Sequence, residues 1–410
     1  MQSKDKPAFN KALLPILLIQ LIGSMGYGII FPIMPYYAAQ FEANPLTVGL
    51  LSASYAVCSL LAGPILGQLS DRYGRRPWLL FSQLGTVLGF VLFGIGGSLW
   101  MLFLGRIVDG ISGGNIVIAQ AYVSDVTKPE DRTRVFGLMG AAFGLGFVLG
   151  PIIGSLLSPF GFAVPSFAAA GMALIAAITT FFMLPESVKQ SGAPTKRQTV
   201  IEQFAAIGQV LRRPELRTML TLFAAMTMTM ALFVTTIGQF MQLQIKAPAS
   251  QSGYPAAAFG LFNILFQVLL VGRMVKSLGE RRMIPIGFAA LFVANLGLFF
   301  VSTLWFTIAL GGFLAFGMTL LRPSLTALIS QRVGAHEQGK VLGVNQSIDS
   351  LAQVIAPILG GWLIGTFTPG TPGLLAAGLA AMALVIFFGV RASLPERAMA
   401  GPMKPATAAK

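Results

Sequence analysis

The sequence predicts an all-α membrane protein with twelve transmembrane helices, arranged as two pseudo-symmetric six-helix bundles. Its composition is the first reason. Of the 410 residues, 55% are hydrophobic and 10% are charged, whereas about a quarter of the residues of a soluble domain are charged. The second reason is that apolar runs of about 20 residues, enough to cross a bilayer as a helix, recur along the chain. The third reason is that the two halves of the chain repeat each other.

Twelve apolar runs account for the predicted helices, with boundaries set to within a few residues. They are residues 12–36, 46–70, 78–97, 99–124, 134–158, 162–184, 216–244, 253–275, 283–302, 304–331, 340–366 and 371–391. A polar interruption after the sixth run predicts two bundles joined by a cytoplasmic linker, which contains an amphipathic piece near 200–211. The predicted regions are a first bundle, the linker, a second bundle and a cytoplasmic tail, at residues 1–184, 185–215, 216–391 and 392–410.

The repeat has a nearly constant offset. Gly74–Arg76 corresponds to Gly279–Arg281, 205 residues later. Ser98–Trp100 corresponds to Thr303–Trp305 at the same offset. This agreement between separate segments indicates that the second bundle is a duplicate of the first.

The charges predict how the chain crosses the membrane. The sequence has 28 lysines and arginines against 14 acidic residues. Nearly all the basic residues lie at the chain ends or in alternate loops, and Lys246 alone lies in a loop on the other side. We therefore expect both ends and the linker in the cytoplasm. Because the basic residues form no continuous solvated patch, a nucleic-acid partner is not expected.

Several other functions are disfavoured by what the chain contains. Cys58 is the only cysteine and His336 the only histidine, so neither a disulfide framework nor a histidine metal site is expected. No nucleophile–base pair indicates an enzyme. Lys4, Lys6 and Lys11 precede an apolar run that is too long for the core of a signal peptide, so we expect this run to stay as the first helix.

The loop after the second run carries the most specific motif. Residues 67–76 read GQLSDRYGRR, and this pattern resembles the signature loop between helices 2 and 3 of the major facilitator superfamily. The alternative is an ordinary basic loop, which would need neither the glycines nor the aspartate. The resemblance implies a cytoplasmic gate, in which Asp125 pairs with Arg75 while Asp71 faces the start of helix 11. The gate residues are Gly67, Asp71, Arg72, Gly74, Arg75 and Asp125.

The resemblance covers about residues 12–391 and implies a transporter with its substrate site between the two bundles, near the middle of the membrane. The fifth run resembles the antiporter signature of the superfamily, with its final glycine replaced by Ser155. The alternative is a general interface of small residues. The residues of this motif are Gly146, Gly150, Pro151 and Gly154.

The fourth run contains Arg106 and Asp109, which share a helix face because they are three residues apart. A rise of ~1.5 Å per residue from Trp100 places Asp109 about 13 Å deep. Ionisable groups at such depth are functional candidates. The sequence around Arg106 resembles the helix 4 motif of the drug:proton antiporters, which implies a role in proton transfer. The alternative is a static ion pair.

Asp109 departs from the pattern of that family. The tetracycline/proton antiporters, which the first half resembles most, carry acids in helices 1 and 3. The corresponding stretches here, Gln20–Tyr27 and Gln83–Thr86, have none. We therefore predict that Asp109 has taken over proton coupling.

Asp349 and Arg322 form a second candidate pair. Asp349 lies about 13 Å along its helix from Lys340, and Arg322 precedes Pro323 in the tenth run. The pair would neutralise both charges. Two readings stay open: Asp349 is a second protonation or cation-binding site, or it is a structural partner of Arg322.

The sequence thus predicts a proton-coupled antiporter that exports small lipophilic or cationic drugs by alternating access. The alternatives are an exporter of a specific lipid or metabolite and a non-transporting membrane sensor. We expect a monomer in the bacterial inner membrane that uses the proton gradient and no cofactor or metal. Its partners are a small-molecule substrate, protons and the lipid bilayer. Candidate substrate-binding residues are Tyr27, Asn115, Gln120, Phe143, Phe147, Gln239, Asn263, Gln267, Asn345 and Gln346.

Overall fold

The computed structural model describes residues 13–128, 131–187, 208, 210, 212–333 and 337–390. Nearly all of these residues are helical, and the described part contains no β-strand. The predicted tail at 392–410 and most of the predicted amphipathic piece near 200–211 lie outside the described residues.

Within the described residues, the first half of the chain forms seven α-helices and one short 3₁₀ turn, η1 (Ser158–Phe160). The helices are α1 (Leu13–Ala39), α2 (Pro45–Tyr73), α3 (Arg75–Ile95), α4 (Leu99–Ile111), α5 (Asn115–Val126), α6 (Arg132–Leu157) and α7 (Ala163–Met183).

The second half repeats this arrangement with two irregular pieces. They are the 3₁₀ turn η2 (Ala249–Gln251) and the π-helical turn η3 (Gln267–Val271). The α-helices are α9 (Pro214–Leu243), α10 (Tyr254–Phe266), α11 (Gly272–Phe300), α12 (Leu304–Ser330), α13 (Gln338–Thr366) and α14 (Thr371–Val390).

Eleven stretches of the described chain are long and apolar enough to cross a membrane. One of them, Ala249–Phe300, has 52 residues and reverses direction at Gly279, where φ is 74°. It therefore holds two spans, which brings the total to the predicted twelve. Gly74, the counterpart of Gly279 in the repeat, also has a positive φ of 104°. Both turns thus need a conformation that favours glycine.

The fourth predicted helix, 99–124, is wrong in one respect: it is two helices. α4 ends at Ile111 and α5 begins at Asn115. The intervening Gly113 and Gly114 are poor helix formers. Ser82 of α3 compensates for the break, because its hydroxyl accepts a hydrogen bond from the Gly114 amide at 3.1 Å and donates one to the Ser112 carbonyl.

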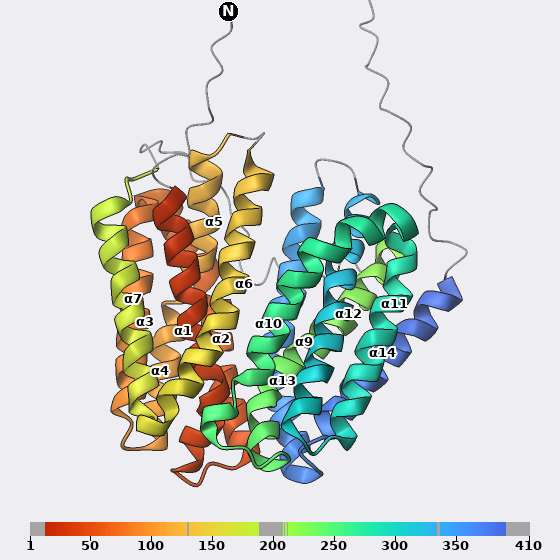
Figure 1. The fold of residues 1–410 in the computed structure, drawn as a ribbon. Helices are drawn as coiled ribbons and strands as arrows, with labels where there is room; N and C mark the ends of the chain where they lie inside the picture. The colour runs from red at the N-terminus through yellow and green to blue at the C-terminus, as the bar shows by residue number, and fades with distance from the viewer. Residues whose placement is uncertain are drawn as a thin grey trace, which may run out of the picture.

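The two halves meet mainly through three helix pairs, which are α1 with α9, α2 with α13, and α6 with α10. We call the side of the bundle that holds the start of α1 and the turns at Gly74 and Gly279 the termini side, and the other the far side. Figure 1 shows the ribbons of the two halves close together towards the far side and diverging towards the termini side.

Close contacts join the halves on the far side. The Tyr36 hydroxyl donates to the Ala247 carbonyl at 3.0 Å, and the Gly253 amide donates to the Ser155 hydroxyl at 2.8 Å. Gly49 of α2 packs against the backbone of Pro357 in α13. These contacts hold the far side together.

Candidate functional site

The predicted pair of Arg106 and Asp109 is present in the core of the first half. A guanidinium nitrogen of Arg106 lies 3.1 Å from a carboxylate oxygen of Asp109. Only 3% of Arg106 and 5% of Asp109 is exposed. The guanidinium carbon lies 4.3 Å from the ring centre of Tyr55, so the cation also has an aromatic partner.

Helix α3 supplies the other neighbours of Asp109. The Thr86 hydroxyl is within hydrogen-bonding reach of the Asp109 carboxylate, and the Asn115 amide donates to the same hydroxyl at 3.5 Å. Gly89 lets α3 approach closely, because a Cβ atom there would lie 2.7 Å from the Cβ of Asp109. The carboxylate is therefore held by a cation, a hydroxyl and close backbone packing.

Several polar atoms near this pair lack a partner among the described protein groups. They are the Arg106 Nε, the Asn115 Oδ1 and both polar atoms of the Gln83 side-chain amide. Buried polar atoms are normally hydrogen-bonded to protein or water.

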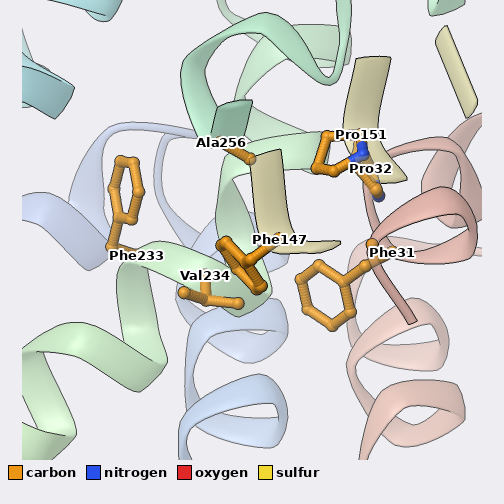
Figure 2. A pocket seen from close by; sticks show the side chains of 8 residues that line it. Phe31, Pro32, Phe147, Pro151, Phe233, Val234 and Ala256 are labelled. Carbon is orange, nitrogen blue, oxygen red and sulfur yellow. The ribbon is translucent and has the colours of Figure 1, made fainter. Parts of the chain in front are cut away.

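An apolar pocket lies where the two halves meet, and Figure 2 shows Phe31, Phe147, Phe233 and Val234 around it. Helices α1, α6, α9 and α10 all contribute to its walls. The lining residues are Gly28, Phe31, Pro32, Phe147, Pro151, Phe233, Val234 and Ala256. A site built from both halves changes shape whenever the halves move relative to each other.

A row of aromatic rings connects the buried pair to this pocket. Arg106 lies over the ring of Tyr55, whose centre is 6.2 Å from that of Tyr27. The ring of Tyr27 stacks on Phe31 at 5.3 Å, and Phe31 lines the pocket. A change in the Arg106–Asp109 pair can thus reach the interface through direct contacts.

The second predicted pair is also present. The Arg322 guanidinium lies 2.9 Å from one carboxylate oxygen of Asp349, and the Thr227 hydroxyl donates to the other at 3.0 Å. The partners differ in exposure: 58% of the Arg322 side chain is exposed but only 11% of that of Asp349.

The predicted gate residues gather at the termini side of the first half. Arg75 pairs with Asp71 and, at 2.9 Å, with Asp125. Glu186, which follows α7, accepts hydrogen bonds from the backbone amides of Arg75 and Arg76 at 2.8 and 3.1 Å. An acid at this position satisfies free amides and the dipole of the α3 N-terminus.

Of the remaining gate residues, Gly74 forms the turn with positive φ, and Gly67 and Arg72 have local roles. The Gly67 carbonyl accepts a hydrogen bond from the Ser70 hydroxyl at 2.7 Å. The Arg72 guanidinium lies 5.1 Å from the ring centre of Tyr73.

The glycines of the predicted antiporter motif face α1. A Cβ atom on Gly146 would lie 2.6 Å from the Leu21 carbonyl, and one on Gly150 would lie 2.5 Å from the Met25 carbonyl. Gly154 packs equally closely on Ile29. The motif therefore makes one continuous close contact between α6 and α1. Helix α6 continues through Pro151.

The predicted substrate residues do not form one cluster. Phe147 lines the pocket, Phe143 stacks on Phe147 at 6.1 Å, and Tyr27 lies beside Phe31. Asn263 donates to Thr319 at 3.0 Å in the second half. The remaining candidates divide by exposure. Gln239 and Asn345 are buried, Asn115 lies near Thr86, and Gln120, Gln267 and Gln346 are exposed.

Sequence reasoning missed Phe31, Phe233, Ser155 and Glu186. Phe31 had a usable signal, because it precedes Pro32 inside an apolar helix. Ser155 was seen only as a replacement for glycine, although its hydroxyl joins the two halves. Glu186 falls in the first residues after a helix, where only the fold shows its distance from Arg75.

The repeated bundles, the pocket between them and the buried ion pairs define an integral membrane transporter. The family model described as "Major Facilitator Superfamily" matches residues 16–248 and 219–409. The chain belongs to the Major Facilitator Superfamily, which is a family of transporters and not of enzymes.

Similar proteins agree with this assignment. The chain is 33% identical over 388 residues to the tetracycline resistance protein, class E, of Escherichia coli, covering 92% of this chain and 94% of that protein. It is 31% identical over 368 residues to multidrug resistance protein 2 of Bacillus subtilis (strain 168), covering 86% and 89%. The solved structure of the peptide transporter POT in complex with sulfate has the same fold. Its TM-score is 0.75 at 16% identity, with 94% and 95% of the two chains covered.

Proposed function

We propose that this protein exports small lipophilic compounds in exchange for protons, by alternating access across the bacterial inner membrane. Relatives named for resistance to tetracycline and to multiple drugs support export. The pocket between the halves has an apolar lining, which suits lipophilic molecules, but it encloses only about 10 Å³ in this structure, so the halves must move apart there to admit a substrate. A monomer is sufficient, since one chain supplies both halves of the pocket.

The observation that carries proton coupling is the contact route from Asp109 to the pocket. Protonation of Asp109 removes its charge and weakens its attraction for Arg106. Arg106 then changes its position over Tyr55, and the movement passes through Tyr27 to Phe31 at the pocket. Substrate binding in the pocket acts on Asp109 by the same route, because coupling between two sites is reciprocal.

The directions of substrate loading and release follow from the topology that we propose, in which the termini side faces the cytoplasm. Contacts such as Ser155–Gly253 close the far side in this structure, which corresponds to a state that loads substrate from the cytoplasm. To release substrate outside, the halves must separate on the far side and close on the termini side. The cluster of Arg75, Asp71 and Asp125 then lies at the cytoplasmic closure.

The test is the Asp109→Asn variant, which keeps the size of the side chain and removes the titratable group. We expect bacteria that produce the unchanged protein to grow at tetracycline concentrations that stop control cells. Cells that produce Asp109→Asn, at equal membrane levels, should be as sensitive as control cells.

Asp131→Asn is the matched control, because Asp131 is exposed at the start of α6 and its side chain makes no capping hydrogen bond. It should protect as well as the unchanged protein. Full protection by Asp109→Asn would contradict proton coupling through this residue. Failure of the unchanged protein to protect against any lipophilic drug in a panel would contradict export.

A further inference from the structure

The two side chains of the Arg322–Asp349 pair differ in exposure, and the proposed proton route does not use this pair. Asp349 is largely buried and holds Arg322 through one guanidinium nitrogen at 2.9 Å. Most of the Arg322 side chain remains exposed, at 58%. The pair therefore presents a positive charge to its surroundings and keeps its negative charge covered.

From its neighbours we infer that the exposed guanidinium faces the space between the two halves. Arg322 belongs to α12, but its partner Asp349 is on α13, and Thr227, which also binds Asp349, is on α9. Helices α9 and α13 both contact the first half of the chain. Exposure to lipid would be costly for an arginine, so the open side of the guanidinium faces water in this interior space.

The depth of Arg322 places it on the termini side of the pocket. It lies eight residues before Ser330, the end of α12, which corresponds to about 12 Å along the helix. A molecule that enters from the termini side reaches Arg322 within the membrane-spanning region, before the far-side contacts block its path.

A second polar group lies beside the pair without a partner. Asn345 is one helical turn from Asp349 on α13, so both side chains share a face. Asn345 is 5% exposed, and its Oδ1 has no hydrogen-bond partner among the described groups. Buried amides are normally paired, and this free acceptor suits an N–H or O–H group of a ligand.

We propose that Arg322 and Asn345 form a recognition site for lipophilic molecules that carry an acidic group. The free N–H donors of Arg322 bind a carboxylate or sulfonate by charge-assisted hydrogen bonds. Asn345 accepts a hydrogen bond from a neighbouring donor of the ligand. Asp349 binds one side of the guanidinium and competes with a ligand for it, and its burial behind Arg322 makes the site unfavourable for cations. The site extends the lipophilic or cationic substrate class expected from the sequence to anions, and it rests on the proposed export function.

Binding to the purified protein in detergent tests this site without requiring transport. The probes share one ring system and differ in charge: 2-naphthoate, 2-naphthamide and 2-naphthylmethylammonium. We expect the unchanged protein to bind naphthoate at least about tenfold more tightly than the other two, the size of effect that one charge-assisted hydrogen bond gives. Arg322→Gln should remove this preference, and Arg322→Lys should keep part of it.

Asp349→Asn distinguishes recognition from a purely structural ion pair. If Arg322 recognises anions, removal of the competing carboxylate leaves naphthoate binding equal or tighter. If the pair is structural, Asp349→Asn and Arg322→Gln weaken the binding of all three probes alike. If Arg322→Gln does not fold, Asp349→Asn alone still distinguishes anion recognition from a structural ion pair. Arg132→Gln, an exposed arginine in the first half, is the control and should bind naphthoate normally.

Preferential binding of the ammonium probe, or unchanged naphthoate binding in Arg322→Gln, would overturn the proposal, as would no binding of naphthoate to the unchanged protein. None of these results depends on proton coupling. Asp109→Asn should bind naphthoate in this assay even though it fails to protect cells, so failure of the site and failure of the proposed function are separable.

Discussion

At the scale of single residues, the position of Asp109 depends on two neighbouring glycines without side chains as much as on the polar groups that contact its carboxylate. Gly89 on α3 has no side chain, and Gly105 on α4 has none either, so the two helices touch backbone to backbone beside the carboxylate. This close approach keeps Asp109 against Arg106 and Thr86.

Gly89→Ala should therefore disturb the site directly. Its new Cβ atom would lie 2.7 Å from the Asp109 Cβ and 2.8 Å from the Gly105 carbonyl, which cannot move without its helix. We expect a loss of about 1–3 kcal/mol in stability, as for other overpacked cores, together with loss of drug resistance. Thermal unfolding in detergent measures the first effect.

Gly171→Ala on α7 is the matched control, since a Cβ atom there meets nothing within 4 Å. It should leave the unfolding temperature unchanged or slightly raised, because alanine favours helices. Equal unfolding temperatures for Gly89→Ala and Gly171→Ala would contradict the packing described around Asp109.

Residue spacing predicted part of this site. Arg106 and Asp109 are three apart in one helix, so their contact follows from local geometry, and the structure has it at 3.1 Å. The contacts of Asp109 with Gly89 and of Arg106 with Tyr55 join different helices. No local rule fixes the rotation of one helix against another, so these contacts could not be predicted.

At the scale of helices and turns, the repeat places Gly74 and Gly279 at equivalent turns, but their surroundings differ. Gly74 and Gly279 both have a positive φ, at 104° and 74°. A Cβ atom on Gly74 would also lie 2.6 Å from the Glu186 carboxylate, whereas one on Gly279 would meet nothing within 4 Å.

Alanine at each turn should thus have unequal effects. Gly279→Ala carries only the cost of the backbone conformation, about 1–3 kcal/mol. Gly74→Ala carries this cost and also displaces Glu186 from the start of α3. We expect the lower unfolding temperature for Gly74→Ala, measured for both variants in the same detergent. The reverse order would contradict the role given to Glu186.

Ser155 should influence which side of the protein opens. Ser155→Ala removes the hydrogen bond to the Gly253 amide that joins α6 to the start of α10. A loss of about 1 kcal/mol shifts an equilibrium about fivefold. Spin labels on Phe160→Cys and Thr368→Cys, in a Cys58→Ala background, report the far-side distance. We expect a larger share of long distances.

Ser158→Ala provides the comparison, because the Ser158 hydroxyl bonds the Ser155 carbonyl within the same half. Its distance distribution should match that of the unchanged protein. If Ser155→Ala also matches it, the hydrogen bond does not help to hold the far side closed.

Most helices could be predicted from the sequence, because a run of apolar residues fixes a membrane span by its length alone. The break at Ser112–Gly114 was not predicted, since glycines are common inside membrane helices. It becomes a break here because Ser82 of a neighbouring helix satisfies the exposed backbone groups.

At the scale of the whole molecule, two repeated bundles enclose an apolar pocket, and the charged groups lie at different distances from it. The Arg106–Asp109 pair is buried in the first half, and the Arg322–Asp349 pair exposes its cation in the second. The sequence repeat predicted that the two helix bundles have similar folds. It did not predict these charges, because each half has changed its own side chains since the repeat arose.

The proposed mechanism requires Asp109 to gain and lose a proton as the halves exchange between their two arrangements. Its most direct test is the pH inside proteoliposomes, followed with a trapped dye when tetracycline is added. The unchanged protein should shift the internal pH. Asp109→Asn should give no shift while it still exchanges labelled for unlabelled tetracycline without a gradient. An equal pH shift from both proteins would contradict the claim.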